Sequence, residues 1–140
     1  MIVQPYLNFE GRCEEAVEFY KRKLGAEVSM LMHNSDAPAG AHGCPTPPPP
    51  GKVMHCALQI GGSVVMATDG MCQGTPNFQG FSLSLTAAND AEATRLFEAL
   101  ASEGGNVTMP IAATFFATRF GMVTDRFGVA WMVLSMPAGK

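Results

Sequence analysis

Charged residues are scarce in this chain, and features that would place it in several common classes are missing. Only 15% of its 140 residues are charged, the formal net charge is -3, and no basic run occurs. Nucleic-acid binding relies on basic patches, so nucleic acid is not an expected partner. No apolar run approaches the ~20 residues that span a bilayer, and residues 1–5 lack the basic start of a signal peptide. We therefore expect a cytoplasmic protein without a membrane partner.

Paired cysteine motifs are also missing. The four cysteines include no Cys-x-x-Cys pair, so we expect reduced thiols rather than a disulfide framework. Cys56 lies in an apolar stretch, where a thiol most often serves packing. His33, His42 and Cys44 fit no standard zinc-finger spacing, and a metal site in that segment is not the favoured interpretation.

The sequence does contain an internal repeat. In each half a strand pattern precedes an amphipathic helix, and a glycine-containing turn, Gly61-Gly62 or Phe127-Gly128, later separates two further strand patterns. Two copies of one unit predict an α+β fold of two βαβββ modules, about 1–69 and 80–136, in a single domain. The expected strands are 2–9, 27–32, 52–60, 63–69, 81–85, 106–109, about 117–125 and 128–136, and the expected helices are 12–24 and Asn89 or Asp90 to about Ser102.

One segment interrupts the repeat. Six of the ten prolines fall within residues 34–51, including Pro47-Pro48-Pro49-Pro50. This composition predicts a long loop, which in a small domain is either a lid over a site or a disordered insertion. Both interpretations remain open at this point.

Short motifs spread over nearly the whole chain, apart from that loop, carry a family resemblance. They are Pro5 to Phe9, Cys13 to Ala16, Phe19-Tyr20, Gly51 to His55, Val107 to Pro110 and Arg119 to Val129. Together with the element order they resemble the vicinal oxygen chelate superfamily of glyoxalase I, extradiol dioxygenases, and fosfomycin- and bleomycin-resistance proteins. The closer resemblance is to its PhnB-like branch, some members of which are named demethylubiquinone methyltransferases. The resemblance implies modules curved around a shared cavity, and a homodimer.

In metal-dependent members of that superfamily, the ligands stand on the first and fourth strands of each module. Strand alternation places Gln4, Met66, Ser82 and Met132 at these positions. Divalent cations prefer carboxylate or imidazole donors to an amide, a hydroxyl and two thioethers. We therefore expect no metal and no other cofactor.

Alternation also predicts which side chains line the cavity. Counting back from Gly61-Gly62 places His55 beside Thr68, and counting back from Phe127-Gly128 places Arg119 on the face of Met132. An apolar surface with a few polar groups is typical of a small-molecule pocket. The expected ligand-binding residues are Gln4, Tyr6, His55, Met66, Ser82, Arg119 and Met132, with Asn8, Gln59, Thr68 and Ser84 completing the surface.

Two of these residues are candidates for chemistry. His55 is either a general acid or base, or a histidine hydrogen-bonded within the sheet. Arg119 either holds an anionic group, or pairs with an acid such as Asp125 or with one across a dimer interface. The leading hypothesis is metal-free binding or sequestration of a small apolar or anionic molecule in the inter-module cavity. The alternative is a lyase, transferase or dioxygenase of the superfamily that uses His55 and Arg119 or an unrecognised metal site. Methyl transfer is disfavoured because no glycine-rich cofactor loop follows a strand.

Overall fold

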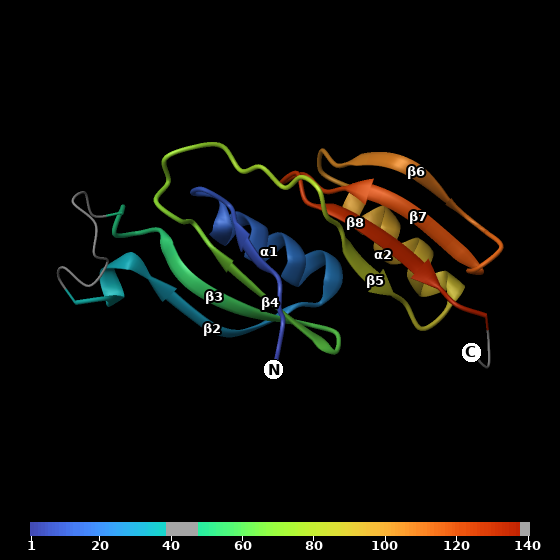
Figure 1. The fold of residues 1–140 in the computed structure, drawn as a ribbon, viewed down its shortest axis with the longest axis horizontal. Helices are drawn as coiled ribbons and strands as arrows, with labels where there is room; N and C mark the ends of the chain where they lie inside the picture. Colours follow the sequence, from blue (N-terminus) through green and yellow to red (C-terminus); the bar gives the residue numbers. More distant parts are fainter. Residues whose placement is uncertain (39–47, 138–140) are drawn as a thin grey trace. The chain divides into compact units, whose positions relative to one another are not determined.

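The structure, a computed structural model, describes residues 1–38 and 48–137 and contains two compact units, Met1–Pro76 and Asn77–Lys140 (Figure 1). Within the described residues, each unit has one α-helix and one four-stranded sheet. Residues 39–47, which include His42 and Cys44 and most of the expected lid or insertion, lie outside the described residues. The described helices include none that is long and apolar enough to cross a membrane.

The first unit follows the order strand, helix and three strands, as the repeat predicts. Its sheet has the order β1-β4-β3-β2; β1 runs parallel to β4, and the other neighbours are antiparallel. The elements are β1 (Tyr6–Asn8), α1 (Cys13–Leu24), β2 (Glu27–His33), a short 3-10 helix η1 (Asn34–Asp36), β3 (Val53–Ile60) and β4 (Ser63–Thr68).

Helix α1 forms where the apolar stripe predicts it. The expected stripe is Cys13, Ala16, Val17, Tyr20 and Leu24; the first four of these are buried and Leu24 is half-buried. Phe19, which the stripe did not include, is also buried. Gly25 ends the helix in the left-handed conformation, with φ of 69° and its N–H bonded to the carbonyl of Lys21. The helix therefore covers one face of the sheet.

The hairpin between β3 and β4 confirms the two-residue turn at Gly61-Gly62. Ile60 pairs with Ser63, and this register carries on to Ala57 opposite Met66. Gly61 has φ of 56°, a conformation that glycine adopts without steric strain. Tyr6, Met66 and Ala57 therefore lie in one row across the sheet and share a face, as strand alternation predicts.

The second unit repeats the order with a sheet β5-β8-β7-β6. Asn89, one of the two residues expected to cap the helix, is the N-cap: its side-chain oxygen accepts the N–H of Glu92 at 2.8 Å. The elements are β5 (Leu83–Thr86), α2 (Asp90–Ala101), β6 (Asn106–Ala112), β7 (Arg119–Thr124) and β8 (Ala130–Ser135).

The hairpin between β7 and β8 corrects the sequence-based register. The sequence suggests a two-residue turn at Phe127-Gly128, whereas Thr124 pairs with Ala130 across the longer loop 125–129. Asp125 organises this loop, since one carboxylate oxygen accepts the N–H groups of Phe127 at 2.9 Å and Val129 at 3.1 Å. The longer loop shifts the pairing by one residue, which moves every side chain of β7 to the opposite face relative to β8.

Both first strands are shorter than the alternating pattern suggests. β1 begins at Tyr6, after Pro5, and β5 begins at Leu83. Gln4 and Ser82 therefore precede the strands on which the sequence placed them. In the first unit the physical reason is Pro5, which lacks the N–H that would continue the parallel ladder.

Candidate functional site

Among the described residues of the first unit, helix α1 covers one face of the sheet and no helix covers the other. Leu7, Cys56 and Ala67 stand in register on the α1 side, and each is at most 2% exposed. Tyr6, Met66 and Ala57 form the neighbouring row and point the other way, because successive side chains alternate across a strand. Tyr6 keeps 52% of its surface exposed. We call this side the open face.

Tyr6 and His55 meet on the open face. The Tyr6 hydroxyl lies 2.9 Å from His55 Nδ1, and the two ring centroids are 5.3 Å apart in an edge-to-face arrangement. The hydrogen bond fixes the orientation of the imidazole. No described residue forms a hydrogen bond with His55 Nε2, so this nitrogen is free to bind a ligand or exchange a proton.

Three polar side chains that the sequence placed on the open face are already engaged with the backbone or a neighbour. Asn8 donates to the Glu10 carboxylate and accepts the Glu10 N–H, both at 2.9 Å. Thr68 donates to the carbonyl of Met54 at 2.7 Å, and Gln59 donates to the carbonyl of Gly61 at 2.9 Å. Of the predicted polar residues on this face, Tyr6 and His55 are the two that bond each other.

Methionines surround the Tyr6–His55 pair. Met66 stands beside Tyr6, and from β2 Met30 stands beside Ala57 and Met32 beside His55. Sequence analysis identified Met66 but missed Met30 and Met32, because it assigned no register to β2. The signal was their spacing of two in a strand. Flexible, polarisable thioethers give this surface an adaptable apolar character.

Arg119 does not lie where the sequence placed it. It stands in register with Ser135, and Met122 rather than an odd-numbered β7 residue faces Met132. A Cβ at Gly121, which shares the face of Arg119, would lie 2.6 Å from the Phe97 ring of α2. Arg119 is therefore on the helix side of its sheet, and its predicted place beside Met132 is wrong.

The contacts of Arg119 explain this position. Its Nη1 donates to the carbonyl of Thr118 at 2.8 Å and lies 3.8 Å from the Asp90 carboxylate at the start of α2. The hydroxyls of Ser135 and Thr118 donate to Asp90 at 2.6 and 2.5 Å, and these hydrogen bonds, with Arg119 contributing, lower the pKa of that carboxyl. The acid that pairs with Arg119 is Asp90, not Asp125.

The superfamily implies a divalent metal, and the residues present do not fit one. In the first unit Met66 pairs with Tyr6. In the second unit Met132 pairs with Ser84 rather than with Ser82. Amide, thioether and hydroxyl groups at these positions lack the charge and basicity that divalent ions require. The described residues also bring together no group of three His, Cys, Asp or Glu side chains arranged to hold a metal.

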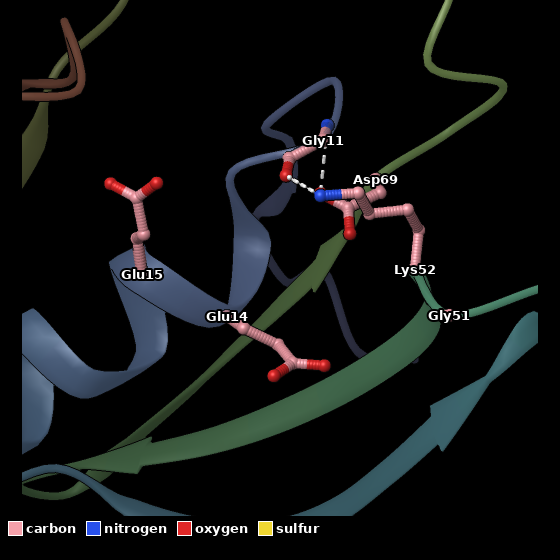
Figure 2. A pocket seen from close by; sticks show the side chains of 6 residues that line it. All are labelled: Gly11, Glu14, Glu15, Gly51, Lys52 and Asp69. Atoms are coloured by element: carbon pink, nitrogen blue, oxygen red, sulfur yellow. Dashed lines mark hydrogen bonds between the residues drawn. The ribbon is translucent and has the colours of Figure 1, made fainter. Parts of the chain in front are cut away.

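A polar pocket of about 160 Å³ lies at the start of α1 (Figure 2). Its lining includes neither Tyr6 nor His55. Asp69 accepts the N–H of Gly11 at 2.8 Å, and Lys52 donates to the Gly11 carbonyl at 2.9 Å. Because these groups bond one another, we assign the pocket no ligand. It is lined by Gly11, Glu14, Glu15, Gly51, Lys52 and Asp69.

Two four-stranded mixed sheets, each with one α-helix, are the fold of glyoxalase/bleomycin-resistance-type proteins. A glyoxalase-related enzyme from Fulvimarina pelagi matches 98% of this chain and 88% of its own with a TM-score of 0.65. Its 18% identity makes this a likeness of fold alone.

Residues 2–134 match the 3-demethylubiquinone-9 3-methyltransferase family, and the chain belongs to this PhnB-like family. Protein YjdN of Escherichia coli (strain K12) is 37% identical over 139 residues, covering 95% of this chain and 94% of its own. Protein PA1353 of Pseudomonas aeruginosa is 41% identical with a TM-score of 0.81 and coverage of 97% and 98%. A putative 3-demethylubiquinone-9 3-methyltransferase, PhnB protein, from Bacillus cereus is 25% identical with a TM-score of 0.78 and coverage of 96% and 99%.

Proposed function

We propose that this chain binds a small molecule with an apolar body and a polar or anionic group, without a metal, on the open face of the first unit. The observation that supports this is the Tyr6–His55 pair, whose Nε2 is free, set among methionine side chains. The thioethers contact the apolar body, and His55 with Tyr6 meets the polar group. Sites of this kind commonly combine an apolar lining with a few placed polar groups.

Benzoate and phenol are suitable first probes, because each combines an aromatic ring with an oxygen that can reach His55. Binding is measured by saturation-transfer NMR and titration on the unmodified protein and on His55→Gln and Tyr6→Phe. We expect each substitution to weaken binding about fivefold to tenfold, the effect of losing one hydrogen bond worth about 1 kcal/mol.

The matched control is His33→Gln. His33 lies at the end of β2, where its ring contacts the Glu14 carboxylate rather than the open face. We expect this variant to bind both probes as the unmodified protein does. Two results would contradict the proposal: unchanged binding by His55→Gln and Tyr6→Phe, or no binding of benzoate or phenol to the unmodified protein.

An enzymatic role for His55 is the second candidate. The Tyr6 hydrogen bond holds the imidazole in one orientation, which general acid or base catalysis requires. Arg119, on the helix side of the other sheet, is not a partner in this version. Once a turnover is found, an unchanged rate for His55→Gln would end this candidate.

Methyl transfer, which the family's name specifies, is not the activity we propose. Adenosyl cofactors are commonly held at a glycine-rich turn of a doubly wound parallel sheet. Here each sheet contains one parallel pair, and its other neighbours are antiparallel. A direct test is isothermal titration with S-adenosylmethionine, for which we expect no heat of binding.

A further inference from the structure

Two thiols meet in the core of the first unit, on the covered face of the sheet. Cys13 Sγ, from the first residue of α1, lies 3.8 Å from Cys56 Sγ on β3, and both side chains are fully buried. Both are free thiols. A disulfide joins sulfur atoms about 2.05 Å apart, so rotation of the two side chains with a small backbone shift would close the gap.

The two sulfur atoms share one hydrogen bond, in which either can be the donor. This hydrogen bond favours a single thiolate in the pair: it lowers the pKa of the sulfur that accepts and, together with burial, raises the pKa of the sulfur that donates. Since the thiolate is the reactive form, the sulfur that carries it is the nucleophile. Burial also raises the pKa of Cys72.

Cys56 is also the chain neighbour of His55. The two side chains leave β3 on opposite faces, Cys56 toward α1 and His55 toward the open face. A bond that draws Cys56 toward Cys13 has to move the same short length of β3 that places His55 against Tyr6. Redox chemistry in the core is thereby connected to the open face.

We propose that Cys13 and Cys56 are a redox-sensitive pair, which a hydroperoxide converts to a disulfide that alters the open face at His55. The thiolate of the pair attacks the peroxide oxygen, forming a sulfenic acid and releasing water or an alcohol once the leaving oxygen is protonated. The second sulfur then displaces hydroxide, which leaves as water with the proton of the second thiol. The peroxide is reduced and both thiols are oxidised; any effect on ligand binding rests on the proposed function.

Residues beside Cys13 at the start of α1 line a polar pocket. The polar pocket is lined by Gly11 and Glu14 on either side of Cys13, and by the Asp69 carboxylate that accepts the Cys13 N–H at 2.7 Å (Figure 2). Arg12, at the N-cap position, forms no side-chain cap. Opening of this first turn would admit a small oxidant to the thiols.

The test uses the full chain with Cys44→Ser and Cys72→Ser, which leaves only the two thiols of interest. The protein is treated with hydrogen peroxide under native conditions, quenched with catalase, denatured, alkylated and weighed by mass spectrometry. We expect a product lighter by two hydrogen atoms that resists alkylation and yields a Cys13–Cys56 linked peptide. Reduction with dithiothreitol should restore two alkylated thiols.

Two matched controls, Cys13→Ala and Cys56→Ala in the same background, should form no intramolecular disulfide. Three outcomes would overturn the proposal: both thiols remaining free, oxidation to sulfinic acid without a link, or a link that forms only at urea concentrations that unfold the chain. If an alanine variant does not fold, the test still holds, because the linked peptide is identified in the parent protein that carries Cys44→Ser and Cys72→Ser.

The connection to His55 is tested separately by NMR of the imidazole C–H signals, assigned by their loss in His55→Gln. We expect these signals to shift on oxidation and to return on reduction, while those of His33 stay in place. Unmoved His55 signals in the disulfide form would refute the connection. We expect the oxidised protein to bind benzoate about tenfold more weakly than the reduced protein, because Tyr6 and His55 would no longer be aligned. Failure of the reduced protein to bind benzoate or phenol would count against the proposed function and leave the mass result standing.

Discussion

Asp69 is the residue whose loss should damage the first unit most, and the structure indicates by how much. It is fully buried and accepts three backbone N–H groups, those of Gly11 and Cys13 on one carboxylate oxygen and Val53 on the other, at 2.7–2.8 Å. It thereby joins the end of β4 to the beginnings of α1 and β3. Hydrogen bonds to a charged group contribute about 1.5–3 kcal/mol each, and buried donors left without a partner add about 1–3 kcal/mol each.

These contacts are partly redundant, since water can reach the Gly11 N–H once the side chain is removed. We therefore expect Asp69→Ala to lower the free energy of unfolding by about 4 kcal/mol. Asp69→Asn should lose about 2 kcal/mol, because its one oxygen still accepts from Gly11 and Cys13 while its amide group opposes the Val53 N–H. The measurement is equilibrium urea denaturation followed by circular dichroism, which responds to both units.

Asp36→Ala is the matched control. Asp36 also accepts a backbone N–H, that of His33 at 2.8 Å, but its side chain is 54% exposed. We expect this variant to lose less than about 1 kcal/mol, because water replaces the carboxylate. If Asp69→Ala destabilises no more than Asp36→Ala, the buried network is not what joins α1 to the sheet.

Three further predictions follow from other parts of the molecule. Gly121→Ala should lower the free energy of unfolding, measured by urea denaturation, by about 1–3 kcal/mol, because its Cβ would lie 2.6 Å from the Phe97 ring. Gly62→Ala, which has open space around it, should change this free energy little. Equal effects would refute the assigned face of β7. Asp90→Asn should lower the urea midpoint more at pH 7 than at pH 3. A lowered carboxyl pKa stabilises the fold fully above the ordinary value of 3.8, and this contribution is lost as the pH falls through the lowered value; the same loss at both pH values would contradict this. We also propose a homodimer, from the resemblance found in the sequence; a light-scattering mass equal to that of one chain would refute it.

The sequence by itself determined the two-module organisation of this protein. The buried stripe of α1, the Asn89 cap and the turn at Gly61-Gly62 depend on residues close together in the chain, so local pattern and turn chemistry are sufficient to predict them. The poor donor set for a divalent cation, including Met66 and Met132, also follows from residue types alone.

The tertiary structure alone decided the face of Arg119 and the partners of the site. Strand alternation states which residues share a face, but the loop length sets the register, and the loop organised by Asp125 is longer than the Phe127-Gly128 turn suggests. The Tyr6–His55 hydrogen bond and the Cys13–Cys56 contact join residues 49 and 43 positions apart, which no local pattern specifies. Both contacts arise only when β1, α1 and β3 are packed together, because packing rather than propensity fixes the distance between side chains remote in sequence.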